Sequence, residues 1–186
     1  MIQQEPSVVD RLHSDFSQLI HQIDAAEISL RNSAEEIFQK SLYMAIGSYF
    51  EQRITGYILK FIGKLAGNSV LVIEFARNKA ISRQYHTYFN WNGANVNSFF
   101  GLFGGEFRDY MKEYVNNNAE YGEAIKAFLD VGNVRNEVAH DFGAVSLTKT
   151  TDEIYALYKK ALVFVEQTPL HFDEFMESRQ EFPEQT

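Results

Sequence analysis

The sequence predicts an all-α protein, a single-domain helical bundle of about six or seven helices. Three observations favour this class. The three prolines stand at positions 6, 169 and 183, so none interrupts the chain from Ser7 to Thr168, and proline is the residue that most strongly breaks helices. Apolar residues recur at steps of three and four along most of the chain, the period of an amphipathic helix. Alternating runs of strand length are scarce.

The first two helices are expected in the N-terminal third. Apolar side chains predict a first helix over residues 7–30. Ser33 and Glu36 have the spacing of a capping box, in which a hydroxyl and a carboxylate satisfy free backbone N–H groups, so a second helix is expected to begin there. That helix is long, and Gly67-Asn68 is expected to end it.

A third helix is expected from Ser69 to about Tyr85, with basic residues at its far end. These interleave with the aromatic residues that follow, up to Trp91. Basic and aromatic side chains together can hold phosphates and stack on bases. Because aromatic residues make up 15% of the chain, the same pattern is also typical of a core with a charged rim. Residues 90–97, rich in Asn and Gly, predict a loop.

The second half of the chain continues in the same way. A short helix, a break at Gly104-Gly105 and a helix over about 106–115 are expected. Asn117 with Glu120 predicts the start of a helix that ends near His140, with Gly143 as its stop signal.

The last helices complete a single domain over residues 1–186. Thr150 with Glu153 predicts the start of a further helix. Pro169 is expected to open a short terminal helix, and the polar residues after 179 are expected to fray. The core of the domain is therefore expected over about 7–167, with the short helix and tail at 168–186.

Composition excludes several classes of protein. The chain has no cysteine, which excludes disulfide frameworks, thiolate zinc sites and cysteine nucleophiles. The net charge of −8 disfavours a protein that coats nucleic acid, although a few arginines in one cleft can still bind RNA. No apolar run is long enough to span a membrane, and the N-terminus has no signal core. We therefore expect a cytoplasmic protein without a membrane partner.

The candidate site lies in residues 132–143, where a helix runs toward its end. Arg135, Asn136 and His140 fall within six residues of each other. Residues four apart on a helix are offset by about 40°, so Asn136 and His140 share a face, whereas Arg135 reaches that face only through its long side chain. Val134 and Val138 belong to the apolar face that holds this helix down.

These three side chains suit the cleavage of RNA. Arginine presents a fork of donors to a phosphate, and histidine can give or take a proton near neutral pH. RNA brings its own nucleophile, the 2′-hydroxyl, so neither a metal nor another cofactor is needed. One histidine per chain is one group short, and a two-fold homodimer that pairs two copies of this helix end would supply the second. The alternative interpretation is structural: Arg135 pairs with a nearby carboxylate, and His140 caps the helix C-terminus.

The stretch also resembles a known family signature. It reads Arg135-Asn136-Glu137-Val138-Ala139-His140 and is followed by Asp141-Phe142-Gly143, which resembles the R-x4-H motif of the HEPN superfamily. The layout is similar too, with Ser48-Tyr49-Phe50-Glu51 in a long second helix and a segment rich in Phe and Gly at 99–107. Within the superfamily the chain is most similar to the RiboL-PSP-HEPN-like branch.

The resemblance implies a function and roles for residues. HEPN domains are helical bundles that usually dimerise, and many are metal-independent endoribonucleases of toxin–antitoxin or phage-defence systems. It implies that Arg135 stabilises the phosphate and transition state, that His140 is the acid or base, and that Asn136 is the polar helper. Glu51 and Asp141 are candidates for residues that support the site from outside it; the alternative for Glu51 is a solvated or ion-paired side chain. It also implies an RNA substrate and a partner protein, such as an antitoxin or another defence component.

Two other functions remain open from the sequence. Some HEPN domains are non-catalytic modules for protein or nucleotide binding and dimerisation. A metal-dependent hydrolase would need ligands, for which His171, Asp173 and Glu174 are candidates. His13 and His21, eight residues apart, can share a helix face and are either surface histidines or a metal pair.

Overall fold

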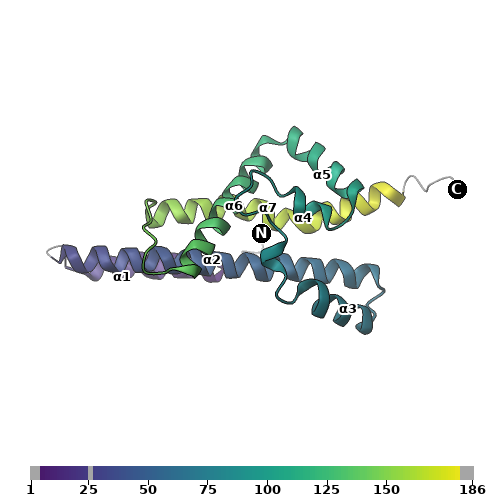
Figure 1. Cartoon of the computed structure of the whole chain (residues 1–186). Coiled ribbons are helices and arrows are strands. Elements are labelled where there is room, and N and C mark those ends of the chain that lie inside the picture. Colours follow the sequence, from purple (N-terminus) through teal and green to yellow (C-terminus); the bar gives the residue numbers. More distant parts are fainter. Residues whose placement is uncertain (1–4, 25–26, 181–186) are drawn as a thin grey trace.

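The computed structural model describes residues 5–24 and 27–180, and these residues are mostly helical (Figure 1). They form seven α-helices, one π-helix and one short 3-10 helix, and no strand occurs among them. The bounds are α1 Val8–Gln22, α2 Ile28–Leu65, α3 Val70–Ala76, the π-helix η1 Arg77–Ile81, the 3-10 helix η2 Tyr85–Thr87, α4 Asn97–Gly101, α5 Gly105–Asn117, α6 Ala119–His140 and α7 Thr151–Gln180. The all-α class predicted from the sequence is confirmed.

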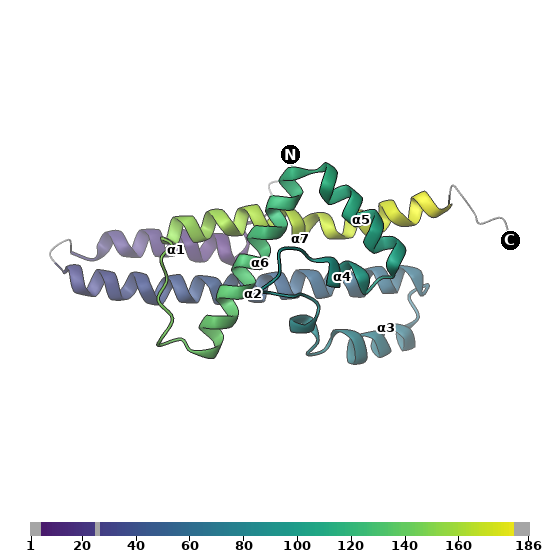
Figure 2. The ribbon, with the colours of Figure 1, turned by 45° about the horizontal axis from the view of Figure 1, so that its top comes forward.

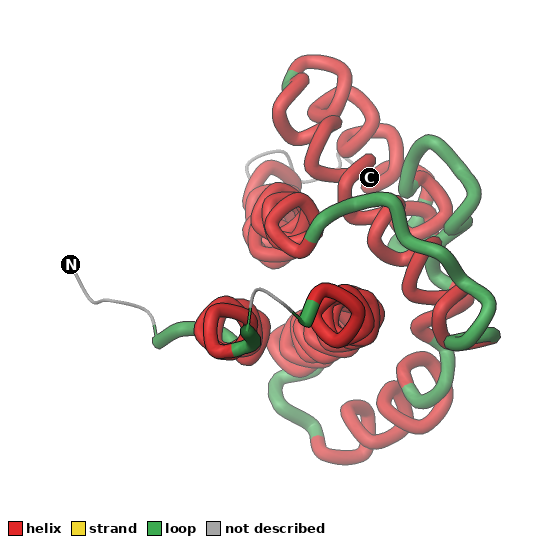
Figure 3. Tube along the Cα trace, turned by 90° about the vertical axis from the view of Figure 1, so that its left-hand side faces the viewer, coloured by secondary structure: helices red, strands yellow, loops and turns green. Residues whose placement is uncertain are grey.

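Two long helices, α2 and α7, form the axis of the molecule. They lie side by side, and α1 packs beside the first half of α2 (Figures 1 and 2). Helix α6 crosses this pair and packs against both helices. Figure 3 looks along the helices of the axis and shows most of the remaining segments gathered on one side. The crossing brings the second half of α6 against the middle of α2.

Aromatic side chains fill the space between α2, α6 and α7. Phe50, Phe128 and Phe164 come one from each helix, and all three are almost completely buried. Ring centroids are 5.6 Å apart between Phe50 and Phe128, and 4.8 Å apart between Phe128 and Phe164. Burial of one such side chain stabilises the fold by about 1.5–3 kcal/mol. This packing fixes α6 relative to its neighbours, and so fixes the residues at its end.

Two predicted helix boundaries are confirmed by their backbone geometry. Gly67 and Asn68 follow the end of α2 with φ values of 57° and 59°, the left-handed conformation that stops a helix. At the start of α7, the Thr150 N–H donates to the Glu153 carboxylate at 2.7 Å, and the Glu153 N–H donates to the Thr150 hydroxyl at 3.3 Å. The predicted capping box is therefore present.

The predicted boundary between the first two helices is wrong. Helix α1 ends at Gln22, and α2 begins at Ile28, so Ser33 lies inside α2 and caps nothing. Glu36 pairs instead with Lys40 one turn later, at 2.7 Å. The helix extends backwards because this segment packs against α1.

Two further boundaries differ from those predicted. The cap of α6 is Asn118 rather than Asn117, and its side chain accepts the Tyr121 N–H at 3.0 Å. The third helix does not reach Tyr85: α3 ends at Ala76 and the chain continues as the π-helix η1. Arg83 then has a φ of 61°, which no regular right-handed helix accommodates. The loop before α4 and the break before α5 are where the sequence predicts them.

Pro169 does not begin a new helix, so this prediction is also wrong. Helix α7 continues through it to Gln180. Proline inside a helix costs about 3 kcal/mol because it removes one hydrogen bond and crowds the preceding turn. Here Val165 and Phe172 are buried on the two sides of Pro169, so packing holds both halves in line. The frayed tail is predicted from Gln180, which is instead the last residue of α7; residues 181–186 lie outside the described residues.

Among the described residues, no helix is both long enough and apolar enough to cross a membrane.

Candidate functional site

The candidate site lies at the second half of α6, where this helix rests on the middle of α2. The aliphatic part of Arg135 lies directly on Gly47 of α2: a Cβ atom at Gly47 would stand 2.7 Å from Arg135 Cγ. Any other residue at position 47 would therefore push the arginine away. Glycine in a helix interior costs about 0.5–1 kcal/mol of stability relative to alanine. At position 47 this cost is offset because only glycine lets the Arg135 side chain approach α2 so closely.

The guanidinium group of Arg135 is held by an amide and by no carboxylate. It donates to Asn136 Oδ1 at 3.1 Å. Its Nε atom is buried and has no hydrogen-bond partner. Within the described part of the chain, Arg135 forms no ion pair, so the structural interpretation that pairs it with an acid has no support. An unpaired arginine is a ready partner for an anion, because a phosphate accepts two of its N–H groups at once.

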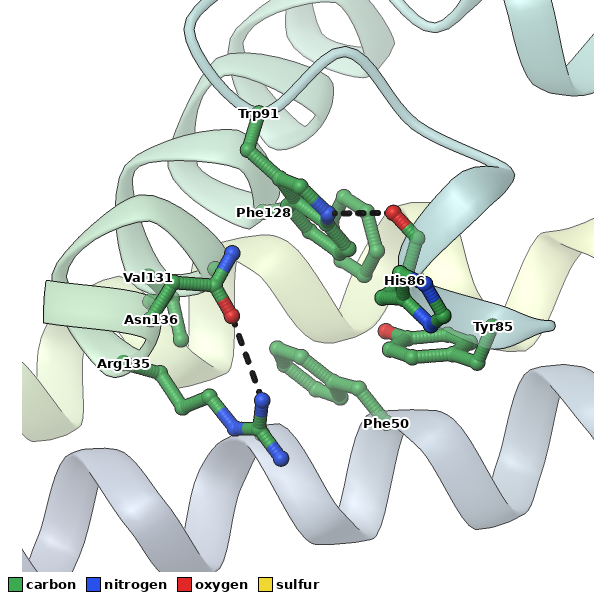
Figure 4. A pocket seen from close by; sticks show the side chains of 10 residues that line it. Phe50, Tyr85, His86, Trp91, Phe128, Val131, Arg135 and Asn136 are labelled. Atoms are coloured by element: carbon green, nitrogen blue, oxygen red, sulfur yellow. Dashed lines mark hydrogen bonds between the residues drawn. The ribbon is translucent and has the colours of Figure 1, made fainter. Parts of the chain in front are cut away.

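A small pocket opens between Arg135 and the segment before α4 (Figure 4). In this view Arg135 and Asn136 enter from one side, and Tyr85 and His86 from the other. The buried rings of Phe50 and Phe128 also line it. The complete lining is Gly47, Phe50, Tyr85, His86, Trp91, Phe128, Val131, Gly132, Arg135 and Asn136. Its free volume of about 10 Å³ suits a single water molecule or one oxygen of a larger group.

Trp91 fastens the far wall of the pocket to α6. A Cβ atom at Gly132 would lie 2.1 Å from the Trp91 ring, so the indole packs directly on the α6 backbone. The Trp91 Nε1–H donates to the main-chain oxygen of His86 at 3.0 Å (Figure 4). The 3-10 helix η2 is thereby held facing Arg135.

Glu51 lies close to the pocket but does not bind Arg135. Burial raises the pKa of the Tyr85 hydroxyl well above its usual range; the charge of Glu51 raises it further, and the charge of Arg135 lowers it. Both charges therefore act on the same hydroxyl, and Tyr85 stays protonated at neutral pH. The structure thus brings Glu51, Tyr85 and Arg135 into one neighbourhood.

His140 stands apart from this pocket. It is the last residue of α6, is exposed, and does not line the pocket. One helical turn separates it from Asn136, a rise of about 6 Å. No hydrogen bond or ion pair holds its ring among the residues the structure describes. The structure therefore joins Arg135 with Asn136 and leaves His140 facing solvent beside them.

Asp141 ends the helix and does not contact the other site residues. Its carboxylate accepts the Ala144 N–H at 3.0 Å and closes the turn after α6. Gly143, predicted as the stop signal, does not have the left-handed conformation of a helix-ending glycine. The end of α6 is therefore where the sequence predicts it, but the side chain of Asp141 makes the turn.

Gly47, His86 and Trp91 were not singled out from the sequence as site residues. The interleaved basic and aromatic stretch gave a partial signal. Tyr88 and Phe89 of this stretch are buried in the core without lining the pocket, whereas the buried Tyr85 and the partly exposed Trp91 both line it. Gly47, isolated inside a predicted helix, is the kind of glycine that has a packing reason.

The candidate metal ligands do not assemble into a group of three or more in the described part of the chain. His13 contacts Asp152 at 2.9 Å and stacks on Tyr155, with ring centroids 3.9 Å apart. His171 is buried and contacts Glu174 at 3.0 Å, and Asp173 pairs with Lys64. Across residues 5–24 and 27–180, no three His, Cys, Asp or Glu side chains gather as a metal site would require.

Comparison with known families supports the family resemblance and the helical fold. The sequence model of the RiboL-PSP-HEPN family matches residues 10–174, which include all of the helices that form the site and most of the chain. Neither the curated proteins nor the solved structures give a match. On the strength of the family match, the chain belongs to the RiboL-PSP-HEPN family, a branch of the HEPN superfamily.

Proposed function

We propose that the protein is a metal-independent endoribonuclease of a toxin or phage-defence type. One observation carries the proposal: Arg135 is held beside Asn136 without an acidic partner, one turn before an unpaired histidine at the end of the same helix. In RNA cleavage, the 2′-hydroxyl attacks the neighbouring phosphorus and the bond to the 5′-oxygen breaks. The protein must then stabilise negative charge and move protons.

Each motif residue has a role in this mechanism. Arg135 binds the phosphate and stabilises the extra charge of the transition state. Asn136 orients the guanidinium through its Oδ1 atom and leaves its Nδ2 free to donate to a phosphate oxygen. His140 takes up or delivers a proton. Glu51, acting near Tyr85, and Asp141, which shapes the helix end, support the site without contacting the reacting atoms.

We also propose that two copies of the α6 end meet in a homodimer. His140 is exposed, and Phe142 beside it is 45% exposed, so an apolar and a catalytic side chain face outward together. A two-fold partner would cover the ring and bring a second Arg135 and His140 into one cleft. Light scattering at micromolar concentration tests this: the dimer mass is expected, and a monomer mass contradicts the shared site.

The biological role follows from the chemistry. An unrestrained ribonuclease in the cytoplasm would destroy the RNA of its own cell, so we propose a partner protein, an antitoxin or a defence component, that restrains it. Production of the wild-type chain alone is expected to arrest growth, while the His140→Ala chain is tolerated. Equal growth of the two strains would count against this role.

Cleavage of RNA by the purified protein tests the proposed function. We expect cleavage to continue in EDTA and to fall by about 10²–10⁴-fold in His140→Ala, the range general acid–base catalysis contributes. His21→Ala, which removes an exposed histidine of α1, is the matched control and should cleave as wild type does. Intact RNA with the wild-type protein, or full activity in His140→Ala, supports the other candidate, a non-catalytic HEPN-type helical module that binds a protein or nucleotide and dimerises. The exposed apolar side chains of α3, Val70, Leu71 and Phe75, are the feature that favours such a module.

A further inference from the structure

A second histidine faces the Arg135 pocket from a distant part of the chain. His86 lies in η2 and lines the same pocket as Arg135 and Asn136, whereas His140 does not. Figure 4 shows His86 across the pocket from Arg135. Its side chain is exposed, and none of the described residues forms a hydrogen bond with its ring. A free imidazole is therefore available at this position.

The position of His86 is set by its main chain rather than by its side chain. Trp91 donates to the His86 carbonyl oxygen, and the Trp91 ring packs on Gly132 of α6. His86 is thus tied to the same helix that carries Arg135. Replacing the imidazole would leave this attachment intact, which makes the residue suitable for a clean test.

Donors converge on the pocket, and no acid lines it. Arg135 has a buried Nε atom without a partner, and Asn136 has an Nδ2 group that its bond to Arg135 does not use. The lining residues include no Asp or Glu. Besides His86, the titratable or charged residues that line the pocket are Arg135 from α6 and Tyr85 from η2, and the charge of Glu51 in α2 acts on the Tyr85 hydroxyl. The free volume suits one oxygen of an anion.

Along the axis of α6, His86 and His140 lie in opposite directions from the Arg135–Asn136 pair. The pocket with His86 extends from this pair toward Gly132 and the N-terminal part of α6, whereas His140 lies one turn beyond it in the opposite direction. In phosphoryl transfer, the attacking and leaving oxygens lie roughly in line on opposite sides of phosphorus. A base for one oxygen and an acid for the other are therefore needed on opposite sides of the phosphate.

We propose that His86 is a substrate-contacting residue that binds the same phosphate as Arg135 and Asn136 and acts with His140 as one of the two proton-transfer groups. One imidazole accepts the proton of the 2′-hydroxyl as the new bond to phosphorus forms. The other donates a proton to the 5′-oxygen as its bond to phosphorus breaks. The inference rests on the proposed function, and it supplies two histidines within each chain.

Binding of inorganic phosphate tests the contact without requiring cleavage. The histidine ring signals of the full-length protein are followed by NMR and assigned through His86→Gln. We expect phosphate to shift the His86 signals in the wild type and to shift them far less in Arg135→Ala, while the His21 signals stay in place. His86 signals that do not move with phosphate overturn the proposal.

The pH dependence of RNA cleavage tests the proton transfer. If one histidine acts as base and the other as acid, the cleavage rate of the wild type plotted against pH is bell-shaped. Its acidic and basic limbs report apparent pKa values of the two histidines together. His86→Ala is expected to cleave about a hundredfold more slowly and to lose one limb, while His21→Ala keeps both rate and shape. A His86→Ala protein with wild-type rate and profile overturns the proposal. A wild-type protein that cleaves no RNA refutes the proposed function instead, and the phosphate titration then still decides whether His86 and Arg135 hold one anion.

Discussion

Two arginines on neighbouring helices meet opposite surroundings. Arg53 of α2 donates to both oxygens of Glu166 in α7, at 2.9 and 2.6 Å, and Tyr57 donates to the same carboxylate at 2.5 Å. Among the described residues, Arg135 of α6 finds only the amide oxygen of Asn136 as an acceptor, and its buried Nε atom has no partner. The fold therefore supplies an acid where an arginine joins two helices and leaves the acid out at the candidate site.

The hydrogen-bond partners distinguish an arginine that holds the fold together from one that is available to a ligand. A buried donor without a partner costs about 1–3 kcal/mol, a cost that a bound anion would remove at Arg135. Around Arg53, every partner belongs to the chain. Around Arg135, none of the described residues supplies a carboxylate, and the pocket beside it has room for one oxygen of the proposed phosphate.

Exchange of the two arginines for alanine should give opposite results. Arg135→Ala is expected to lower RNA cleavage by about 10²–10³-fold, the range for loss of one group that stabilises transition-state charge. Arg53→Ala should leave cleavage near wild type and lower the free energy of unfolding by about 1 kcal/mol, because the lost ion pair is partly exposed. Cleavage rates and urea unfolding of both variants provide the check. Equal loss of cleavage in the two variants would erase the distinction.

A methyl group on α2 should disturb Arg135 without unfolding the protein. Gly47→Ala places a Cβ atom 2.7 Å from Arg135 Cγ, so the arginine must move. A displacement of about 1 Å at such a site can lower the rate by about a hundredfold. Gly56→Ala on the same helix is the matched control, since a Cβ atom there meets nothing within 4 Å. The control should cleave normally and gain about 0.5–1 kcal/mol of stability.

The opposite wall of the pocket can be tested at Gly132. Its replacement by alanine would place a methyl group 2.1 Å from the Trp91 ring and force the indole off α6. We expect the free energy of unfolding to fall by about 1–3 kcal/mol, the usual cost of overpacking. Gly122→Ala on the same helix has its nearest contact at 3.8 Å and should not lose stability through crowding. The melting temperatures of the two variants provide the check. Equal melting temperatures would mean that the packing of Trp91 on Gly132 does not hold the pocket wall to α6.

The smallest effect concerns the polar cluster around Arg53. Asp10 lines the same hollow as Arg53 and Glu166. Burial acts to raise the pKa of Asp10, but hydrogen bonds from Tyr155, Ser7 and Lys159 outweigh burial and hold this pKa well below its usual range. A lowered folded-state pKa contributes stability above the pKa of the unfolded chain, about 3.9, and this contribution fades as the pH falls below it. Unfolding free energies of wild type and Asp10→Asn should therefore converge on acidification. If the difference between the two unfolding free energies stays constant from pH 7 to pH 3, the pKa of Asp10 is not lowered in the folded protein.

The sequence predicted helix boundaries correctly where residues close together in the chain determine them. Gly67-Asn68 ends α2 and Thr150 with Glu153 begins α7, because caps depend on residues three or fewer positions apart. The prediction failed at Ser33 and Pro169. There the helix is decided by distant partners, α1 in one case and the buried neighbours of α7 in the other, and tertiary packing outweighs propensity.

The candidate site shows the same division. The order of Arg135, Asn136 and His140 on one helix end can be read from the sequence because it is a matter of helical spacing. The pocket cannot, since Gly47, His86 and Trp91 reach it from two other segments of the chain. Nor does spacing reveal that Arg135 lacks an acid, because that depends on which carboxylates the fold brings near.

In the proposed mechanism, the 2′-hydroxyl of RNA is the nucleophile. Its most direct test is the chemistry of the products, measured in EDTA on an RNA strand and on its 2′-deoxy copy. The mechanism predicts fragments ending in a 2′,3′-cyclic phosphate from RNA, and no cleavage of the deoxy strand. Fragments with a 5′-phosphate, or equal cleavage of the deoxy strand, would contradict it.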